Sequence, residues 1–355
     1  MSSGTCKTAV VEQYTGDVGR FTIAELEMPR LRTPTSVKIS VHSAALNPID
    51  FKRAEGMLAL VRPEPFPLKL GYDVAGEVTE VGSEVTRFQV GDKVYGRVQS
   101  SEAGTIAEYV VTEEFTLAPI PSNVPYSVAA AVPLAGLTAL QALERAQLKP
   151  GQSLFVSGGM GGVGMFGVML GKHHFKAAEV ITTVSPAKVG RAKQLGATRT
   201  VDYTAETYTS VLENAADVVL DTIGDSDAFK VAKPGGQAVS VAMLPDGQAL
   251  ELFRHPDIPL SVFGTIKLAL AKQVVSAAGW VLTRGFRRKN ITYQYVVMRP
   301  DGQALEEIFN PLLSSETIKP VIANVRPFTI DGVQAAFKES SEGHAAGKII
   351  ICVRD

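Results

Sequence analysis

Apolar residues in the first 120 positions recur in the period of β-strands, with sharp turns between the runs. The alternation is clearest over Val37–Val41, Asp73–Val81 and Thr105–Val111, and it places alternate side chains on opposite faces of a strand. Three prolines between residues 63 and 67 mark a segment that cannot be regular. Many short strands with glycine-containing turns predict a small, barrel-like β domain.

The pattern changes after the proline-rich stretch 119–125. Helical spacing follows over 127–131 and 134–147, and strands and helices then alternate. Such alternation predicts parallel strands joined by crossover helices in a doubly wound α/β sheet. The predicted strands are 153–157, 180–184, 199–203, 217–221 and 236–242, and the predicted helices between them are 162–171 and 187–195. After Met298 the pattern changes again, to a helix over 301–313 and an apolar strand over 348–353.

A glycine cluster stands between a predicted strand and a predicted helix. Gly159, Gly161 and Gly164 fit the pattern G-x-G-x-x-G, in which one glycine makes the turn, one lets the backbone approach a pyrophosphate and one lets helix and strand pack closely. The helix N-terminus adds unpaired N–H groups and a positive dipole end. We therefore predict that this loop binds a dinucleotide, through Gly159, Met160, Gly161, Gly162, Val163 and Gly164. The alternative is a glycine-rich loop that only turns the chain.

The end of the second predicted strand bears on which dinucleotide binds. Sites that prefer NAD usually carry Asp or Glu there, whereas this chain has Ser185, followed by Lys188. A carboxylate would repel a 2′-phosphate, and a hydroxyl and an ammonium would hold it. The two residues predict NADPH as the cofactor. The alternative for Lys188 is a solvent-facing residue in the first turn of a helix.

Length, composition and charge set further limits. A chain of 355 residues favours two domains, and 45% hydrophobic and 20% charged residues are typical of a globular protein. A net charge of −1 argues against nucleic acid or an anionic membrane as the main partner, and the basic run Arg284–Lys289 is interpreted as a solvated loop. Two cysteines leave no disulfide framework, and no targeting segment is evident at the N-terminus, so we expect a reducing, cytoplasmic location.

The most apolar long stretch, Ile258–Leu282, contains Lys267 and Lys272. Two charges within the core of a bilayer are costly. We therefore interpret the stretch as a helix beside a cleft or an interface, and not as a membrane span.

Several short motifs are spread over nearly the whole chain. They are Leu46–Arg53, Gly71–Gly76, Val90–Gly96, Pro133–Thr138, the glycine loop, Leu195–Ala197, Asp221–Gly224, Lys233–Gly236 and Gly343–Lys348. Together they resemble the medium-chain dehydrogenase/reductase superfamily, and most of all its zinc-independent quinone oxidoreductase branch with the enone oxidoreductases and alkenal reductases. The resemblance implies a GroES-like catalytic domain over 1–121 that is completed by 300–355, and a Rossmann NADPH-binding domain over 122–299.

The resemblance also bears on metal binding. Zinc-dependent relatives place a cysteine, a histidine and a second cysteine where this chain has Asn47, Tyr72 and Leu134. These three side chains cannot form a catalytic zinc site, so we expect no metal. Without a Lewis acid, oxidation of an alcohol is disfavoured, whereas hydride transfer to an already polarised acceptor stays feasible.

Candidate site residues follow from the same resemblance. Asn47 would hydrogen-bond the substrate or the nicotinamide ribose, or else only form a turn before Pro48. Lys52 would donate to the developing enolate or quinone oxygen, or else lie on the surface. Tyr72 would line the pocket and donate a proton, or else be a packed aromatic. The expected cofactor site is completed by Thr138, Tyr203 and Asp221.

These observations favour a zinc-independent, NADPH-dependent reductase that transfers a hydride to an activated C=C bond, in an enone or alkenal, or to a quinone. The partner would be a small electrophilic molecule. Relatives often pair through the edge strand of the Rossmann sheet, here 292–297, so we expect a homodimer. Two alternatives stay open: an enoyl reductase for carrier-bound acyl chains with Arg284–Lys289 as a basic rim, and a non-catalytic cofactor-binding protein.

Overall fold

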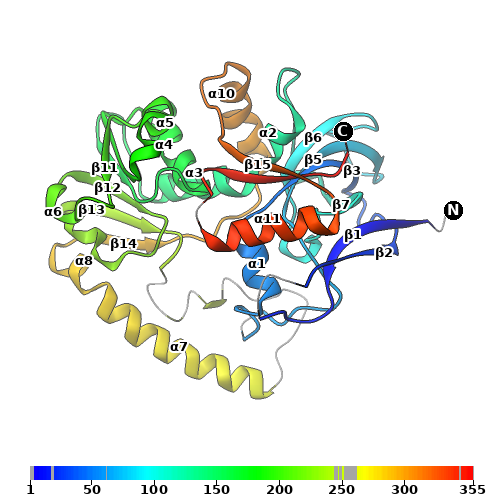
Figure 1. Ribbon diagram of the computed structural model, residues 1–355, viewed down its shortest axis with the longest axis horizontal. Coiled ribbons are helices and arrows are strands. Elements are labelled where there is room, and N and C mark those ends of the chain that lie inside the picture. The colour runs from blue at the N-terminus through cyan, green and yellow to red at the C-terminus, as the bar shows by residue number, and fades with distance from the viewer. Residues whose placement is uncertain are drawn as a thin grey trace. The chain divides into compact units, whose positions relative to one another are not determined.

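The computed structural model describes residues 4–16, 20–60, 62–243, 247, 250–251, 262–343 and 345–354 (Figure 1). These residues form two compact units. Unit 1 contains the described residues up to Leu137 and from Pro300 onward, and unit 2 those between Thr138 and Arg299. Unit 2 begins later than the expected boundary at 121, because α2 (Tyr126–Ala130) contacts strands of unit 1, β3 (Ser36–Ala45) and β5 (Asp73–Val81).

Unit 1 is built on two sheets. In the smaller one, β1 (Thr5–Val11) pairs antiparallel with both β2 (Thr22–Glu27) and β4 (Leu68–Lys69). The larger one has the order β15-β16-β3-β5-β6-β8, and β7 also pairs with β3. Its other strands are β6 (Lys93–Arg97), β7 (Tyr109–Glu113), β8 (Leu117–Pro119), β15 (Ile322–Pro327) and β16 (Lys348–Cys352). The predicted β-rich domain is confirmed, and the pairing of β16 with β3 joins the C-terminal segment to it.

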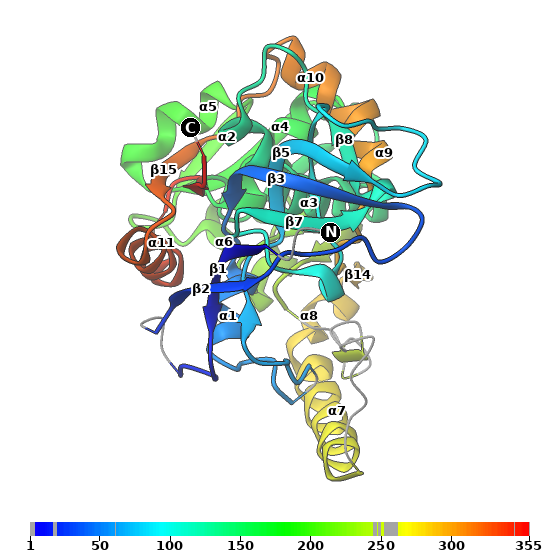
Figure 2. The same ribbon diagram turned by 90° about the vertical axis from the view of Figure 1, so that its right-hand side faces the viewer.

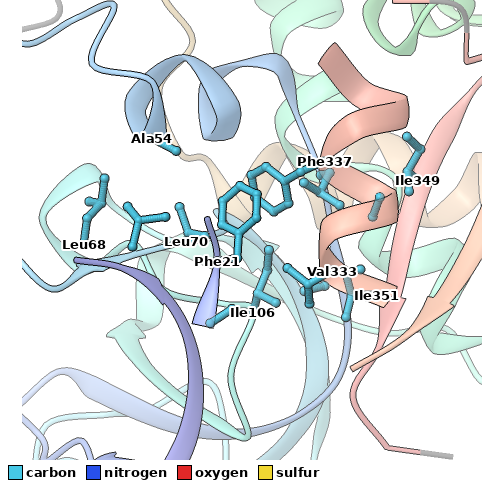
Figure 3. Close-up of a cluster of buried hydrophobic side chains, with 14 residues drawn as sticks. Phe21, Ala54, Leu68, Leu70, Ile106, Val333, Phe337, Ile349 and Ile351 are labelled. Atoms are coloured by element: carbon cyan, nitrogen blue, oxygen red, sulfur yellow. The ribbon is translucent and has the colours of Figure 1, made fainter. Parts of the chain in front are cut away.

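The hydrophobic core of unit 1 joins both ends of the chain (Figure 3). Phe21 packs on Phe337 of α11 (Ile330–Glu342), with ring centroids 4.3 Å apart. Buried aliphatic side chains surround this pair, namely Leu68, Leu70, Ile106, Val333, Ile349 and Ile351. Each such side chain stabilises the fold by about 1.5–3 kcal/mol when it is buried. The C-terminal segment is therefore part of the folding unit and not an appendage to it.

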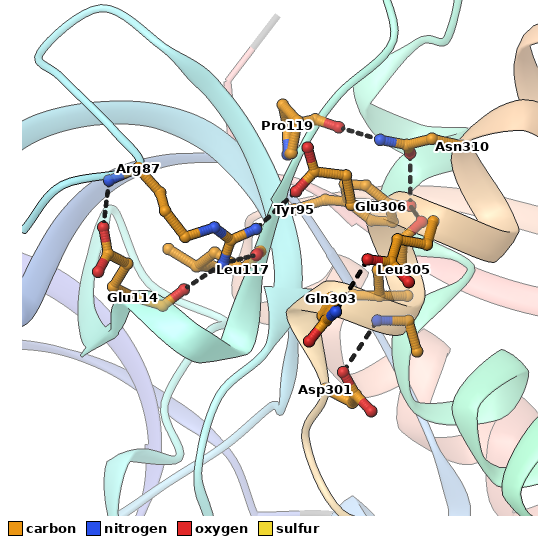
Figure 4. A network of polar contacts seen from close by, with 12 residues as sticks. Arg87, Tyr95, Glu114, Leu117, Pro119, Asp301, Gln303, Leu305, Glu306 and Asn310 are labelled. Atoms are coloured by element: carbon orange, nitrogen blue, oxygen red, sulfur yellow. Dashed lines mark hydrogen bonds and ion pairs between the residues drawn. The ribbon is translucent and has the colours of Figure 1, made fainter.

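A polar network holds the segment that re-enters unit 1 after residue 300 (Figure 4). The hydroxyl of Tyr95 donates to Asn310 Oδ1 at 2.8 Å, and Asn310 Nδ2 donates to the carbonyl of Pro119 at 2.8 Å. Arg87 forms an ion pair with Glu306, with 2.6 Å between Nη2 and Oε2. The re-entering segment is thereby fixed to β6 and β8.

The helix that we predicted over 301–313 is divided into three pieces. Asp301 caps α9 (Gly302–Ala304) by accepting a hydrogen bond from the N–H of Ala304 at 2.9 Å. A π-helical turn over Leu305–Phe309 follows, and then α10 (Asn310–Ser314). Pro311 has no N–H to donate to the preceding turn, which accounts for the interruption.

Unit 2 contains a sheet of order β11-β10-β9-β12-β13-β14, in which every described pairing is parallel. Its strands are β9 (Ser153–Val156), β10 (Glu179–Val184), β11 (Arg199–Asp202), β12 (Ala216–Asp221), β13 (Ala232–Ser240) and β14 (Thr292–Tyr295). The predicted doubly wound sheet is confirmed. The strand order reverses between β9 and β12, and ligands of such sheets bind at the carboxyl ends of the strands at that point.

Helices connect these strands. The last residues of α3 (Pro133–Arg145) belong to unit 2, and α4 (Gly162–His173), α5 (Val189–Gln194) and α6 (Tyr208–Val211) follow in chain order. Between β13 and β14 lie α7 (Val262–Leu282) and α8 (Arg284–Arg288). Residues 258–261, the start of the apolar stretch noted in the sequence, lie outside the described residues.

The expectation of a solvated loop at Arg284–Lys289 was wrong. Most of this run is the helix α8, because Phe286 is buried in the core of unit 2. Its ring lies 4.7 Å from that of Tyr293 and 5.8 Å from that of Phe229, measured between centroids. One buried aromatic side chain within the basic run therefore holds the surrounding arginines in a helix.

Candidate functional site

The glycine loop of unit 2 lies at the reversal point of the sheet, between β9 and α4. A side chain at Gly164 would place its Cβ 2.2 Å from the carbonyl oxygen of Gly158, and one at Gly159 would place it 2.0 Å from Thr182 Oγ1. Both positions therefore require glycine for packing. At Gly161, the N-cap of α4, an added Cβ would meet only the Gly158 oxygen, at 3.3 Å. This side of the loop is open to a phosphate, and the first-turn N–H groups of α4 have no acceptor within the helix.

The loop is held from behind by side chains at the ends of β9 and β12. The carboxylate of Asp221 is buried, and its Oδ1 accepts hydrogen bonds from the hydroxyl of Ser157 at 3.2 Å and from the N–H of Gly224 at 2.9 Å. Its Oδ2 accepts from the hydroxyl of Ser240 at 2.7 Å. Asp221, which we expected to contact the cofactor, thus positions the loops after β9, β12 and β13. Within the glycine loop, the side chain of Met160 is also buried, so only its backbone faces a ligand.

The residues expected at the adenosine end follow two neighbouring strands. Val184 of β10 pairs with Asp202 of β11, so the next residues, Ser185 and Tyr203, leave the same edge of the sheet side by side. Ser185 is half-buried and is the N-cap of a 3-10 turn that contains the half-buried Lys188. Tyr203 is exposed and free to stack on a base. Thr138 is buried on α3.

In unit 1, Asn47 lies in a buried polar cluster. Asn47 is the N-cap of α1 (Pro48–Ala54), and its Nδ2 donates to Asp73 Oδ2 at 2.9 Å. The ammonium of Lys348, at the start of β16, donates to Asn47 Oδ1, to the carbonyl of Leu46 at 2.8 Å and to Asp73 Oδ2 at 3.2 Å. The N–H of Leu134 donates to the other oxygen of Asp73 at 2.8 Å. The amide of Asn47 is therefore already engaged within the protein.

Asp50 borders this cluster on the first turn of α1. Its carboxyl oxygens accept hydrogen bonds from the N–H groups of Asn47, at 2.8 Å, and of Gly71, at 3.2 Å. Complete burial nevertheless raises the pKa of Asp50 to about 6, against the opposing effect of the Asn47 N–H and of Arg53. A carboxyl group that changes charge near neutral pH is thus built into the base of the site.

Tyr72 is buried beside two guanidinium groups. The Cζ atoms of Arg53 and Arg97 lie 5.1 Å and 4.6 Å from the centroid of its ring. Arg53 binds both oxygens of the buried Glu64, at 2.6 and 2.8 Å. Arg97 has no carboxylate partner among the described residues and donates only to Ser100 Oγ, at 3.2 Å. Arg53 Nη1 and Arg97 Nε have no hydrogen-bond partner at all among the described residues.

Lys52 is exposed on α1, and a donor role for it stays a prediction. The buried cations beside Tyr72 are instead Arg53 and Arg97, which sequence reasoning missed together with Lys348. A signal for Lys348 was present, because it is the one charge in an otherwise apolar terminal strand.

The residues present do not fit a catalytic zinc ion. Within the described ranges, no group of three His, Cys, Asp or Glu side chains could hold a metal. Asn47 is bound to an ammonium and a carboxylate, and Tyr72 is buried between apolar and guanidinium groups. The glycine loop, by contrast, fits the pyrophosphate of a dinucleotide, since its open side is at Gly161 and its packed side at Gly164.

Comparison with known proteins gives matches over both units. Residues 33–122 match the family described as alcohol dehydrogenase GroES-like domain, and residues 195–351 match that described as zinc-binding dehydrogenase. The chain is 36% identical to a 2-methylene-furan-3-one reductase of Solanum lycopersicum, over 89% of this chain and 71% of the relative. It is 34% identical to a chloroplastic NADPH-dependent alkenal/one oxidoreductase of Arabidopsis thaliana, over 94% and 77%. The solved quinone oxidoreductase of Coxiella burnetii superposes with a TM-score of 0.81 at 26% identity, over 99% and 100%.

Proposed function

The chain belongs to the medium-chain dehydrogenase/reductase superfamily, in its quinone oxidoreductase branch, and on that premise we propose that it is an NADPH-dependent reductase of enones, alkenals or quinones. The observation that carries the proposal is the glycine loop, open at Gly161 and placed where the parallel sheet reverses. Relatives named as a furanone reductase and an alkenal/one oxidoreductase support this substrate class.

The residues of unit 2 would hold NADPH, which supplies a hydride when it is bound. The N–H groups after Gly161 bind the pyrophosphate, and Ser185 and Lys188 bind the 2′-phosphate. Tyr203 covers the adenine. Asp221 keeps the loops in position without touching the cofactor.

Unit 1 would bind the acceptor and stabilise the charge that develops on it. The β-carbon of an enone accepts the hydride, the C=C electrons move toward the carbonyl oxygen, and an enolate forms. Water or a side chain then protonates the α-carbon, so the sum is addition of one hydride and one proton. Arg53 Nη1 and Arg97 Nε are N–H donors with no partner among the described residues. The ring of Tyr72 lies beside both guanidinium groups. Donors of this kind, aimed at a developing oxyanion, accelerate such reactions about 10²–10³-fold each.

The reaction needs no zinc in this proposal. An enone or quinone is already polarised, and the positive charge that zinc would supply comes from buried guanidinium groups. Chelator treatment should therefore leave activity unchanged. Activity that falls with chelator and returns with added zinc would contradict this part of the proposal.

The decisive experiment follows NADPH oxidation by absorbance with a panel of enones, alkenals and quinones. We expect turnover with at least one class, and a loss of about 10²–10³-fold in kcat for Arg97→Gln, with the Kd of NADPH unchanged. Arg30→Gln, which removes an exposed guanidinium of unit 1 that is paired only with the exposed Glu27, is the control and should keep wild-type activity. Tight NADPH binding without turnover of any acceptor would refute the proposal, and turnover only of thioester-linked acyl chains would favour an enoyl reductase.

We also propose that the protein is a cytoplasmic homodimer. β14 is the last strand of the sheet of unit 2, and its outer edge is unpaired among the described residues. Size-exclusion chromatography with light scattering tests the dimer, and cell fractionation tests the compartment. A monomer that stays monomeric at high concentration would exclude pairing through β14.

A further inference from the structure

The helix α7 carries an apolar surface that faces solvent. Figures 1 and 2 show it (yellow) running away from α8 and from the sheet of its own unit. Its large apolar side chains that are more than half exposed are Ile266, Leu270, Val274, Trp280 and Val281, here called the α7 face. Ile266, Leu270, Val274 and Val281 are spaced by four, four and seven residues. This spacing puts the four aliphatic side chains on one side of the helix. The buried positions Leu268 and Gly279 lie on the opposite side.

The stretch of chain that carries the α7 face is rich in cations. Residues 262–300 contain no Asp or Glu and seven cations, although the whole chain has a net charge of −1. Lys272 is paired with Glu251, and Arg284 and Arg288 are exposed beyond the C-terminal end of the face. At the boundary of an anionic bilayer, the acyl chains are apolar and the headgroups above them are negatively charged. An exposed apolar stripe with cations beside it is complementary to such a boundary.

Trp280 and Arg287 strengthen this reading. The guanidinium Cζ of Arg287 lies 4.9 Å from the Trp280 ring centroid, and Trp280 is the single tryptophan of the chain. Tryptophan and arginine are amphipathic side chains that favour the headgroup level of a membrane. Trp280 lies near the C-terminal end of α7, and Arg287 lies in α8, which follows directly.

The helix is long and apolar enough to cross a membrane by length and composition, but the topology opposes a span. β13 before it and β14 after it pair with each other in one sheet. A spanning α7 would require residues 241–261, with their charges at Asp246, Glu251 and Arg254, to cross the bilayer as well. α7 can therefore lie along a membrane but not through it.

We propose that the α7 face and the cations of α8 dock unit 2 on the surface of an anionic lipid bilayer. A second copy of the chain is a poorer occupant, because two such faces would bring cations of the same sign together. Enones, alkenals and quinones with apolar substituents partition into bilayers, so docking would bring the enzyme to the surface where such acceptors collect. The lipid-binding proposal itself rests only on α7 and α8, and its test does not depend on catalysis.

The test is sedimentation of the full-length protein with phosphatidylglycerol-containing vesicles and with pure phosphatidylcholine vesicles. We expect binding to the anionic vesicles, weaker binding in 0.5 M salt, and a blue shift of Trp280 fluorescence on binding. Arg284→Gln with Arg288→Gln should lower partitioning about 25-fold, since each cation contributes roughly a five-fold factor. Leu270→Gln with Val274→Gln should lower it more than ten-fold without changing the charge.

Matched controls separate docking from general effects. Arg30→Gln with Lys319→Gln removes the same charge from exposed positions of unit 1, and Val90→Gln replaces an equally exposed aliphatic side chain. These variants should bind vesicles as the wild type does. The proposal is overturned if the wild type does not sediment with anionic vesicles or if the α7 variants bind as well as the controls. It is also overturned if the α7 variants abolish a dimer in chromatography without any vesicle binding.

Discussion

Replacing Lys348 with methionine should destabilise unit 1 strongly, because it leaves a buried carboxylate without its cation. Lys348 and Asp73 are 3% and 0% exposed, and their nitrogen and oxygen atoms lie 3.2 Å apart. Methionine keeps the apolar length of the side chain but has no charge and no donors. Asp73 would keep only the neutral donors Asn47 Nδ2 and Leu134 N–H.

The size of the effect follows from that loss. Removing one member of a buried ion pair costs about 3–5 kcal/mol, most of it for the charge left uncompensated. A typical domain is stable by only about 5–15 kcal/mol, so Lys348→Met should lower the urea midpoint markedly. The double variant Lys348→Met, Asp73→Asn has no stranded charge. Its loss should be smaller than the sum of the single losses by about 2–3 kcal/mol.

Urea unfolding followed by far-UV circular dichroism measures the four variants of this cycle. Hydrogen exchange of peptides from β3, β5 and β16 localises the loss to unit 1, which matters because a two-unit chain need not unfold in one step. Lys319→Met is the control, since Lys319 and Glu316 form a pair at 2.6 Å that is about two-thirds exposed, and exposed pairs contribute little to stability. A Lys348→Met protein no less stable than this control, or a double variant that recovers nothing, would refute the reasoning.

Three further predictions concern single groups. Folding raises the pKa of Asp50 from near 4 to about 6. The stability that this carboxyl contributes is therefore complete below pH 4 and falls by about 3 kcal/mol as the pH rises through 6. In Asp50→Asn the free energy of unfolding should depend less on pH between 4.5 and 7, and an unchanged slope would contradict the assignment. Gly164→Ala would place a Cβ 2.2 Å from the Gly158 oxygen, so NADPH binding measured by fluorescence titration should be lost, and retained affinity would mean that the loop does not bind the cofactor. Ser185→Asp with Lys188→Glu should weaken NADPH by about 100-fold relative to NADH, and an unaltered ratio of their kcat/KM values would place the 2′-phosphate elsewhere.

Features that depend on local chemistry could be predicted from the sequence. The glycine loop, the strands of unit 2 and the β-rich character of unit 1 each follow from period and turn residues within about ten positions. The bounds were close: the strand predicted over 199–203 is Arg199–Asp202, and the helix predicted over 162–171 is Gly162–His173.

Features that depend on contacts between distant parts of the chain could not be predicted from the sequence. Lys348 meets Asn47 across most of the chain, and no local pattern states that the two become neighbours. The internal partners of Asp221 could not be predicted for the same reason, since they come from the ends of three different strands. The helix α8 was missed because its six-residue run is basic, and a single buried Phe286 outweighs the charges around it.

Net charge averages over the surface and does not describe a local patch. The value of −1 for the chain conceals a stretch of 39 residues, 262–300, without a carboxylate. Electrostatic attraction to a bilayer acts over about one Debye length, near 8 Å at physiological salt. The proposed docking therefore depends on the local patch and not on the total charge.

Some buried polar groups of unit 1 have hydrogen-bond partners and others do not, and the two sets suit different roles. Lys348 donates to three acceptors, and Asp73 and Asn47 are each bonded to partners within the protein. Unpaired buried donors are costly, about 1–3 kcal/mol each and more for charged groups, and a protein keeps such a cost where it serves function. Arg53 and Arg97 each carry one, beside the Tyr72 ring. The Lys348 cluster is therefore bonded within the protein, and in the function proposed above the oxyanion would be bound by the two arginines.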